Sequence, residues 1–203
     1  MKPLDLFLLS VAIGLSCFTT YVFCTDTNPA VAFQPPDPGP ARNPAFRSIV
    51  LHHSATHGGS AAAFERDHRA RLGGLAYHFI VGNGTGAGDG EIETGYRWRD
   101  QIPGPHTKNQ PVNLESVGIC VVGDLRKSPP SEKQLAALLD LLETLCRDYG
   151  IPAERVLCHK EVDPETVCPG RGLPMDDLRG VIAARLATPK PGTGAQSGLI
   201  PGK

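Results

Sequence analysis

The chain has 203 residues, of which 40% are hydrophobic, and a formal net charge of -1 at pH 7. This length suits one globular domain of moderate size with additional segments at its ends. Because the charge is nearly balanced and no Lys/Arg-rich tract occurs, the composition argues against a nucleic-acid-binding protein, and no nucleic-acid partner is expected.

The N-terminal segment predicts export from the cytoplasm. Lys2 precedes residues 6–24, which contain no charged residue and are rich in Leu, Phe, Val and Ile. A basic start, an apolar middle and the small-residue sequence Ala30-Val31-Ala32 are typical of a cleavable signal peptide. About 20 apolar residues also suffice to span a bilayer. We therefore interpret residues 1–32 as a signal peptide or an N-terminal membrane anchor. The protein is expected in the periplasm, at the cell envelope or secreted, with membrane attachment through residues 6–24 if the leader is retained.

Composition divides the rest of the chain into three parts. Residues 33–45 are rich in proline, which stiffens the backbone, and predict a linker. Residues 188–203 consist largely of Pro, Gly and small polar residues without apolar periodicity, and predict a disordered tail. The globular domain is expected at residues 46–187 and is expected to be a monomer.

Two of the six cysteines, Cys17 and Cys24, lie in the leader. Exported proteins often form disulfides, but a thiol in an apolar strand or helix stripe also serves as a small core residue. The sequence leaves the state of the other four open: Cys120, Cys146, Cys158 and Cys168.

The first half of the domain predicts strands around one polar helix. An apolar run at Ser48–His52 predicts a strand, and a helix is expected near Ser60–Arg71. A strand at Tyr77–Val81 ends in a Gly/Asn-rich turn, and the alternating segment Glu91–Gly95 suits a half-exposed hairpin partner.

The second half predicts the centre of the sheet and its main covering helix. The continuously apolar run Val117–Val122 suits a strand buried on both faces. Ser131 and Gln134 form a capping box at the start of a helix that ends at Gly150. The apolar stripe of this helix comprises Leu135, Leu138, Leu139, Leu142 and Leu145. A strand at Val156–Cys158 and a helix at Met175–Leu186 follow. We therefore predict an α/β fold, a single domain with a central mixed β-sheet flanked by helices.

Three segments carry candidate metal ligands: His52-His53 at a strand end, His159 after a late strand, and Cys168 in a Cys-Pro-Gly sequence. Two imidazoles and one thiolate suit a catalytic zinc site, which leaves its fourth position to water. No His-Glu-x-x-His or paired Cys-x-x-Cys motif occurs, so the residues alone indicate only a His/Cys metal site. A cysteine peptidase, with Cys168 as nucleophile and His52 or His159 as base, is an open alternative.

Four motifs in one order resemble the N-acetylmuramoyl-L-alanine amidases, in the branch that includes phage-type amidases and peptidoglycan recognition proteins. The resemblance runs from about Phe46 to Leu186. It rests on Ile49-Val50-Leu51-His52-His53-Ser54-Ala55-Thr56, Ala76-Tyr77-His78-Phe79-Ile80-Val81, Asn113-x-x-Ser116-Val117-Gly118-Ile119 and His159-x-Glu161-Val162-(x)5-Cys168-Pro169-Gly170.

The resemblance implies a fold of the amidase and recognition-protein type and a Zn²⁺ ion held by His52, His159 and Cys168. Adjacent strand residues point to opposite faces, so only one of the His52-His53 pair is expected to reach the ion; the resemblance selects His52 and makes His53 a neighbour. The family's catalytic tyrosine corresponds to Tyr77. Phage-type members carry a lysine where this chain has Thr166, whose neutral hydroxyl would stabilise an oxyanion more weakly.

The resemblance also places His106 and Asn113 at the substrate groove, although His106 has the alternative of being a solvated loop residue. The implied activity is zinc-dependent cleavage of the amide bond between N-acetylmuramic acid and L-alanine, with peptidoglycan or muropeptides as partners. A non-catalytic peptidoglycan-binding recognition module is the alternative. Retention of Cys168 is a feature of the family's cutting branch.

Overall fold

The computed structural model describes residues 42–189. The predicted leader, most of the linker and nearly all of the predicted tail therefore lie outside the described residues. Within 42–189, no helix combines the length and the apolar character needed to cross a membrane. At the start of this range, the backbone N–H of Asn43 donates to Gln101 Oε1 at 3.0 Å, so the end of the linker contacts the domain.

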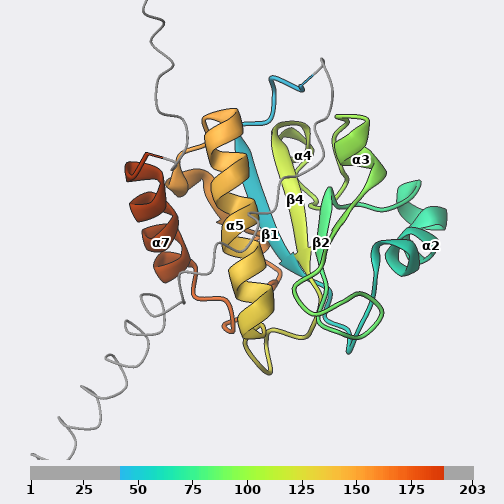
Figure 1. The fold of residues 1–203 in the computed structure, drawn as a ribbon. Helices are drawn as coiled ribbons and strands as arrows, with labels where there is room; N and C mark the ends of the chain where they lie inside the picture. Colours follow the sequence, from blue (N-terminus) through green and yellow to red (C-terminus); the bar gives the residue numbers. More distant parts are fainter. Residues whose placement is uncertain (1–41, 190–203) are drawn as a thin grey trace, which may run out of the picture. The chain divides into compact units, whose positions relative to one another are not determined.

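The described part contains five strands, six α-helices and one short 3-10 helix (Figure 1). In chain order they are β1 (Ser48–His53), α2 (Ala61–Leu72), β2 (Phe79–Val81), β3 (Ile92–Thr94), α3 (Tyr96–Arg99), α4 (Gln110–Glu115), β4 (Ser116–Val121), α5 (Glu132–Tyr149), η1 (Ala153–Arg155), β5 (Val156–Cys158), α6 (His159–Val162) and α7 (Met175–Ala187).

The strands form one mixed sheet in the order β3-β2-β4-β1-β5. Strands β2, β4, β1 and β5 are parallel, and β3 is antiparallel to β2. The predicted fold class, the central position of β4 and the hairpin pairing of β3 are confirmed. Strand β2 begins at Phe79, two residues later than predicted, so Tyr77 lies just outside the strand ladder.

One face of the sheet is covered by the long amphipathic helix α5 and by α7 (Figure 1). The capping box of Ser131 with Gln134 and the left-handed cap at Gly150 are both present. The predicted stripe is buried except for Leu135, which is only half-buried. Leu141, outside the predicted stripe, is also fully buried.

The opposite face of the sheet is built from small residues on its central strand. In a strand, alternate side chains point to the same face, and in β4 these are Ser116, Gly118 and Cys120. The apolar cluster on this face includes Phe64 of α2 and Ile80 of β2. The sequence suggested a uniformly apolar β4. In the structure, the small residues on one face of β4 leave space that the ring of His106 occupies next to Gly118.

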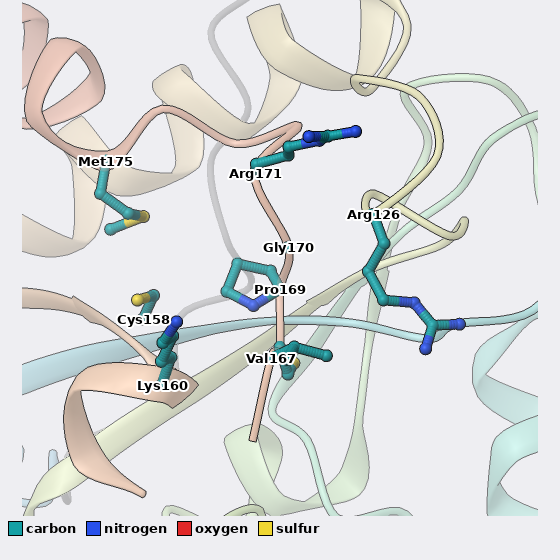
Figure 2. Close-up of a pocket in the computed structure, with 9 residues that line it drawn as sticks. Arg126, Cys158, Lys160, Val167, Pro169, Gly170, Arg171 and Met175 are labelled. Atoms are coloured by element: carbon teal, nitrogen blue, oxygen red, sulfur yellow. The ribbon is translucent and has the colours of Figure 1, made fainter. Parts of the chain in front are cut away.

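The Cys-Pro-Gly segment before α7 lies against the loop that follows β4 (Figure 2). The backbone N–H of Gly172 donates to Leu125 O at 2.8 Å. Gly170 has φ 94°, and a Cβ there would meet the backbone of Arg126 at 2.7 Å, so only glycine fits this approach. This contact fixes the position of the nearby Cys168.

Candidate metal centre

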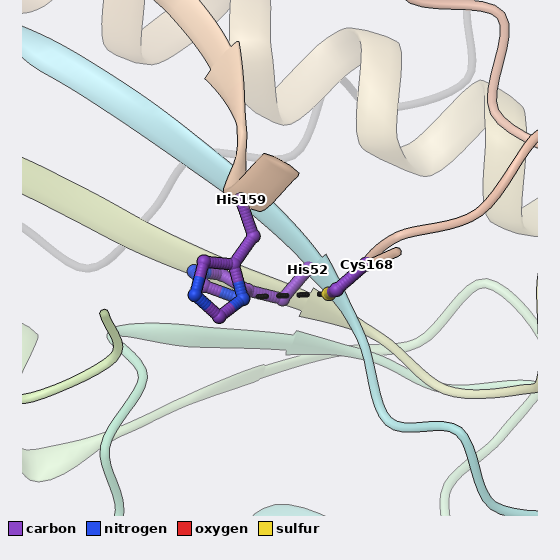
Figure 3. Close-up of side chains that lie close together, drawn as sticks. All are labelled: His52, His159 and Cys168. Carbon is purple, nitrogen blue, oxygen red and sulfur yellow. Dashed lines mark hydrogen bonds between the residues drawn. The ribbon is translucent and has the colours of Figure 1, made fainter. Parts of the chain in front are cut away.

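The three predicted ligands converge at one edge of the sheet (Figure 3). One ligand atom from each of His52, His159 and Cys168 lies within 4.8 Å of the other two. The distance from His52 Nδ1 to Cys168 Sγ is 3.9 Å. This group is the only set of three or more His, Cys, Asp or Glu residues with metal-binding geometry within residues 42–189.

Parallel pairing explains why distant residues meet here. Strands β1 and β5 are parallel neighbours, with Leu51 opposite Cys158, so their carboxyl ends lie at the same edge. His52 is near the end of β1, and His159 follows β5 directly. The segment after α6 then folds back, since the backbone N–H of Lys160 donates to Cys168 O at 2.9 Å.

His53 faces away from this group. Its Nδ1 accepts a hydrogen bond from the backbone N–H of Leu125 at 3.1 Å. Its own backbone N–H donates to Cys168 Sγ at 3.4 Å. The side chain is therefore engaged on the other face of β1, while its backbone supplies a donor that favours a thiolate at Cys168.

Burial controls the protonation of the two most enclosed ligands. His52 is 1% exposed, and this burial, together with the neighbouring His106 and His159, lowers the pKa of its ring well below the usual value. Burial raises the pKa of the Cys168 thiol to about 11. The neutral imidazole is suited to bind a cation, whereas the thiol becomes a thiolate near neutral pH only if a cation stabilises it.

All four described cysteines are free thiols. Cys120 is fully buried in the apolar cluster on the site-facing side of the sheet, as expected of a core residue.

A carboxylate contacts the ring of His159. His159 Nε2 lies 2.9 Å from Asp163 Oδ2, and the same oxygen accepts from the backbone N–H of Lys108 at 2.8 Å. Burial alone would raise the pKa of Asp163, but these two contacts hold it below its usual value. The ionised carboxylate can therefore orient the His159 ring, as carboxylates commonly do beside metal-binding histidines.

His106 is buried beside His52, which contradicts the alternative that it is a solvated loop residue. It is 6% exposed, and its Nδ1 lies 3.1 Å from His52 Nε2. Burial lowers the pKa of its ring to about 3. Asn113 is also buried, and within residues 42–189 its side chain bonds to Thr107.

A cavity of about 530 Å³ opens beside His159. It is lined by Tyr77, His106, His159 and Thr166, among others, but not by Asn113. The Tyr77 ring lies 5.2 Å from the His52 ring, and burial raises the pKa of its hydroxyl well above the usual value. Thr166 Oγ1 accepts from the backbone N–H of Cys168 at 3.2 Å, which leaves its hydroxyl proton available.

A second pocket, of about 480 Å³, includes Cys168 in its lining (Figure 2). Its other lining residues include Arg126, Lys160 and Arg171. Arg126 is paired with Asp124 at 2.7 Å. Each of the two pockets thus borders one of the three candidate ligands.

Sequence reasoning missed the residues that support the ligands. Asp163 follows His159 at a spacing of four residues, which is a recognisable signal for a paired side chain. Ser116 and Gly118 stand inside the third motif, but nothing in the sequence indicates which side chain they contact.

A family model described as N-acetylmuramoyl-L-alanine amidase matches residues 41–171. No curated protein sequence matches the chain. Among solved structures, the chain is similar to the N-acetylmuramoyl-L-alanine amidase LysC from Clostridium intestinale, with 26% identity, a TM-score of 0.58, and coverage of 69% of this chain and 88% of LysC.

Two recognition proteins bound to a muropeptide are also similar. A variant of Drosophila PGRP-LB in complex with tracheal cytotoxin shows 28% identity and a TM-score of 0.52, with coverage of 63% of this chain and 77% of that one. Peptidoglycan recognition protein LE in complex with tracheal cytotoxin shows 26% identity and a TM-score of 0.56, with coverage of 74% and 88%.

Proposed function

The chain belongs to the N-acetylmuramoyl-L-alanine amidase family, and from that premise we propose that it is a zinc-dependent hydrolase. The proposed reaction cleaves the amide bond between N-acetylmuramic acid and L-alanine in peptidoglycan or muropeptides. The structural neighbours support this partner, since they include an amidase and recognition proteins in complex with tracheal cytotoxin.

The observation that carries the proposal is the convergence of His52, His159 and Cys168, with their ligand atoms within 4.8 Å of one another. The donor set fits Zn²⁺, which prefers imidazole nitrogen and thiolate sulfur in a tetrahedral arrangement. When bound, the ion would supply Lewis acidity toward the scissile carbonyl and toward water.

The chain's own residues would then serve the reaction from the cavity that His159 borders. The hydroxyl of Tyr77 stays protonated because burial raises its pKa, so it can donate to the oxyanion that develops on the carbonyl oxygen. The hydroxyl of Thr166 can add a second, neutral donor. Its oxygen accepts from the backbone N–H of Cys168, and its proton is available to the oxyanion. Both groups line the same cavity as His159.

The alternative of a cysteine peptidase is weakened by the state of Cys168. Burial raises the pKa of its thiol to about 11, and the low pKa of the buried His52 ring makes that ring a poor base. Reactive cysteines usually have a thiol pKa lowered by nearby positive groups. The non-catalytic recognition module is the stronger rival, since recognition proteins are among the structural neighbours.

We also propose that the protein reaches peptidoglycan by export through residues 1–32, either released or held by residues 6–24. The monomeric state is likewise a prediction from the sequence. Fractionation of expressing cells and N-terminal sequencing of the mature chain would test export, and an unprocessed chain found only in the cytoplasm would contradict it.

The test of the activity compares the full chain with His159→Ala. The native chain is expected to bind one zinc and to release stem peptides from purified sacculi, and both properties should be lost in the variant and on chelation. His53→Asn is the matched control, because it keeps an acceptor for Leu125 N–H and leaves the three ligands unchanged.

Two outcomes would contradict the proposal. Zinc-loaded protein that binds sacculi without releasing stem peptide would indicate a recognition module. Release that survives chelation and stops on alkylation of Cys168 would indicate a cysteine peptidase.

A further inference from the structure

The ring of His52 is tied into a buried chain of hydrogen bonds that leads away from the other ligands. His52 Nε2 lies 3.1 Å from His106 Nδ1. His106 Nε2 lies 3.3 Å from Ser116 Oγ, and Ser116 Oγ lies 2.6 Å from Val112 O. This series of hydrogen bonds runs from β1 through a loop residue to β4 and α4.

The donor and acceptor of each hydrogen bond in this series follow from its last group, the carbonyl oxygen of Val112. A backbone carbonyl can only accept, so the Ser116 hydroxyl donates to Val112 O, and Ser116 Oγ accepts from His106 Nε2–H. In the neutral His106 ring, Nδ1 then carries no proton and accepts from His52 Nε2–H. His52 is thereby left with an unprotonated Nδ1, the atom that faces Cys168 Sγ at 3.9 Å.

We propose that His106 is a positioning residue of the metal centre, which selects the tautomer of His52 whose Nδ1 is free to bind the ion. This inference rests on the proposed metal site at His52, His159 and Cys168. It changes the role expected for His106, which the sequence resemblance assigned to substrate binding.

The surroundings of His106 leave its ring little freedom to reverse this order. Gly118 lies under the ring, and a Cβ at that position would stand 2.6 Å from His106 Cδ2. His78 packs at 6.2 Å between ring centroids and is itself fixed, since its Nδ1 accepts from Gly118 N–H at 2.9 Å. His106 is 6% exposed, so water competes little for its nitrogens. A reversed His106 tautomer would place a second ring proton opposite His52 Nε2–H, or would force His52 to carry its proton on Nδ1.

Two substitutions separate the acceptor from the bulk of the ring. His106→Phe keeps an aromatic ring of similar shape but removes both nitrogens. His106→Asn puts an amide oxygen near the place of Nδ1 and so keeps the acceptor for His52. We expect His106→Phe to lower zinc affinity about 10- to 100-fold, as loss of a partner to a metal-bound histidine usually does, and His106→Asn to retain most of the affinity.

Zinc affinity of the full chain is measured by competition with a chromophoric chelator, and the absorption spectrum of the cobalt-loaded protein reports the ligand geometry. The thermal midpoints of the metal-free variants control for folding. A folded His106→Phe protein with native zinc affinity and cobalt spectrum would overturn the proposal. Equal losses of zinc affinity in the Phe and Asn variants would also overturn it, because the affinity would then depend on the shape of the ring and not on its acceptor nitrogen.

A variant-free measurement decides the same point if His106→Phe fails to fold. Long-range ¹H–¹⁵N correlations of the metal-free native chain identify the ring nitrogen of His52 that carries the proton. Protonated Nε2 supports the proposal, and protonated Nδ1 overturns it. This reading is independent of activity, so absence of hydrolysis would contradict the proposed function without affecting the tautomer result.

Discussion

Replacing Gly118 with alanine is expected to destabilise the domain and weaken zinc binding together. The new Cβ would lie 2.6 Å from His106 Cδ2 and 2.7 Å from Cγ, whereas carbon atoms in contact normally stay about 3.5 Å apart. The ring must therefore move by about 0.9 Å. Because Gly118 lies in the central strand of the sheet, the backbone has little room to yield.

The size of the effect follows from this geometry. Overpacking of a buried site costs about 1–3 kcal/mol, which lowers the Tm of a domain of this size by about 2–12 °C. The His52 Nε2 to His106 Nδ1 distance is already 3.1 Å, so a displacement of this size is enough to break the bond. Zinc affinity should then fall about 10- to 100-fold.

Urea denaturation of the metal-free full chain and a zinc competition titration measure the two effects. Gly180→Ala is the matched control: this helical glycine in α7 has open space where a Cβ would stand, and alanine there should stabilise by about 0.5–1 kcal/mol. A Gly118→Ala protein with native stability and native zinc affinity would refute the reasoning.

Three further predictions concern neighbouring side chains. Tyr77→Phe should lower kcat about 10²- to 10³-fold with zinc content unchanged, because only the oxyanion donor is lost; a parallel loss of zinc in metal analysis would contradict this role. Asp163→Asn should weaken zinc binding about 10- to 100-fold by removing the carboxylate beside His159, and an unchanged chelator titration would argue against it. Burial lowers the pKa of His78 to about 4. As the pH falls from 6.5 toward 4, His78 therefore binds a proton in the unfolded chain but not in the folded one. The free energy of unfolding decreases over that pH range. The free energy of unfolding should drop by about 2 kcal/mol between pH 7 and 5 from this residue, and His78→Asn should abolish that part of the drop in urea titrations of the metal-free protein.

The helices and strands with strong local signals were predictable from the sequence. Helix α5 is an example, because its capping residues and its leucine spacing are local properties of the chain. Strand β2 was predicted too long, since an apolar run does not reveal where pairing with β4 begins. The burial of Leu141, which lies beside the predicted stripe, was also missed.

The candidate ligands were likewise predictable, and their supporting residues were not. His52, His159 and Cys168 carry chemistry in their side chains and stand at motif positions, so their types and order are informative. His106 was assigned to substrate binding or to solvent, because a histidine in a Gly-Pro-His sequence carries no mark of its burial. Asn113 was expected at the groove, and within residues 42–189 its side chain bonds to Thr107.

The sequence by itself determined the family, the α/β class and the identity of the candidate metal-binding side chains, because these depend on residue types in a fixed order. Only the tertiary structure decided which nitrogen of His52 faces Cys168, which residue holds that ring, and why β4 carries serine and glycine beneath it. Those features depend on hydrogen-bond partners and free space between segments far apart in the chain, and such contacts exist only once the sheet has formed.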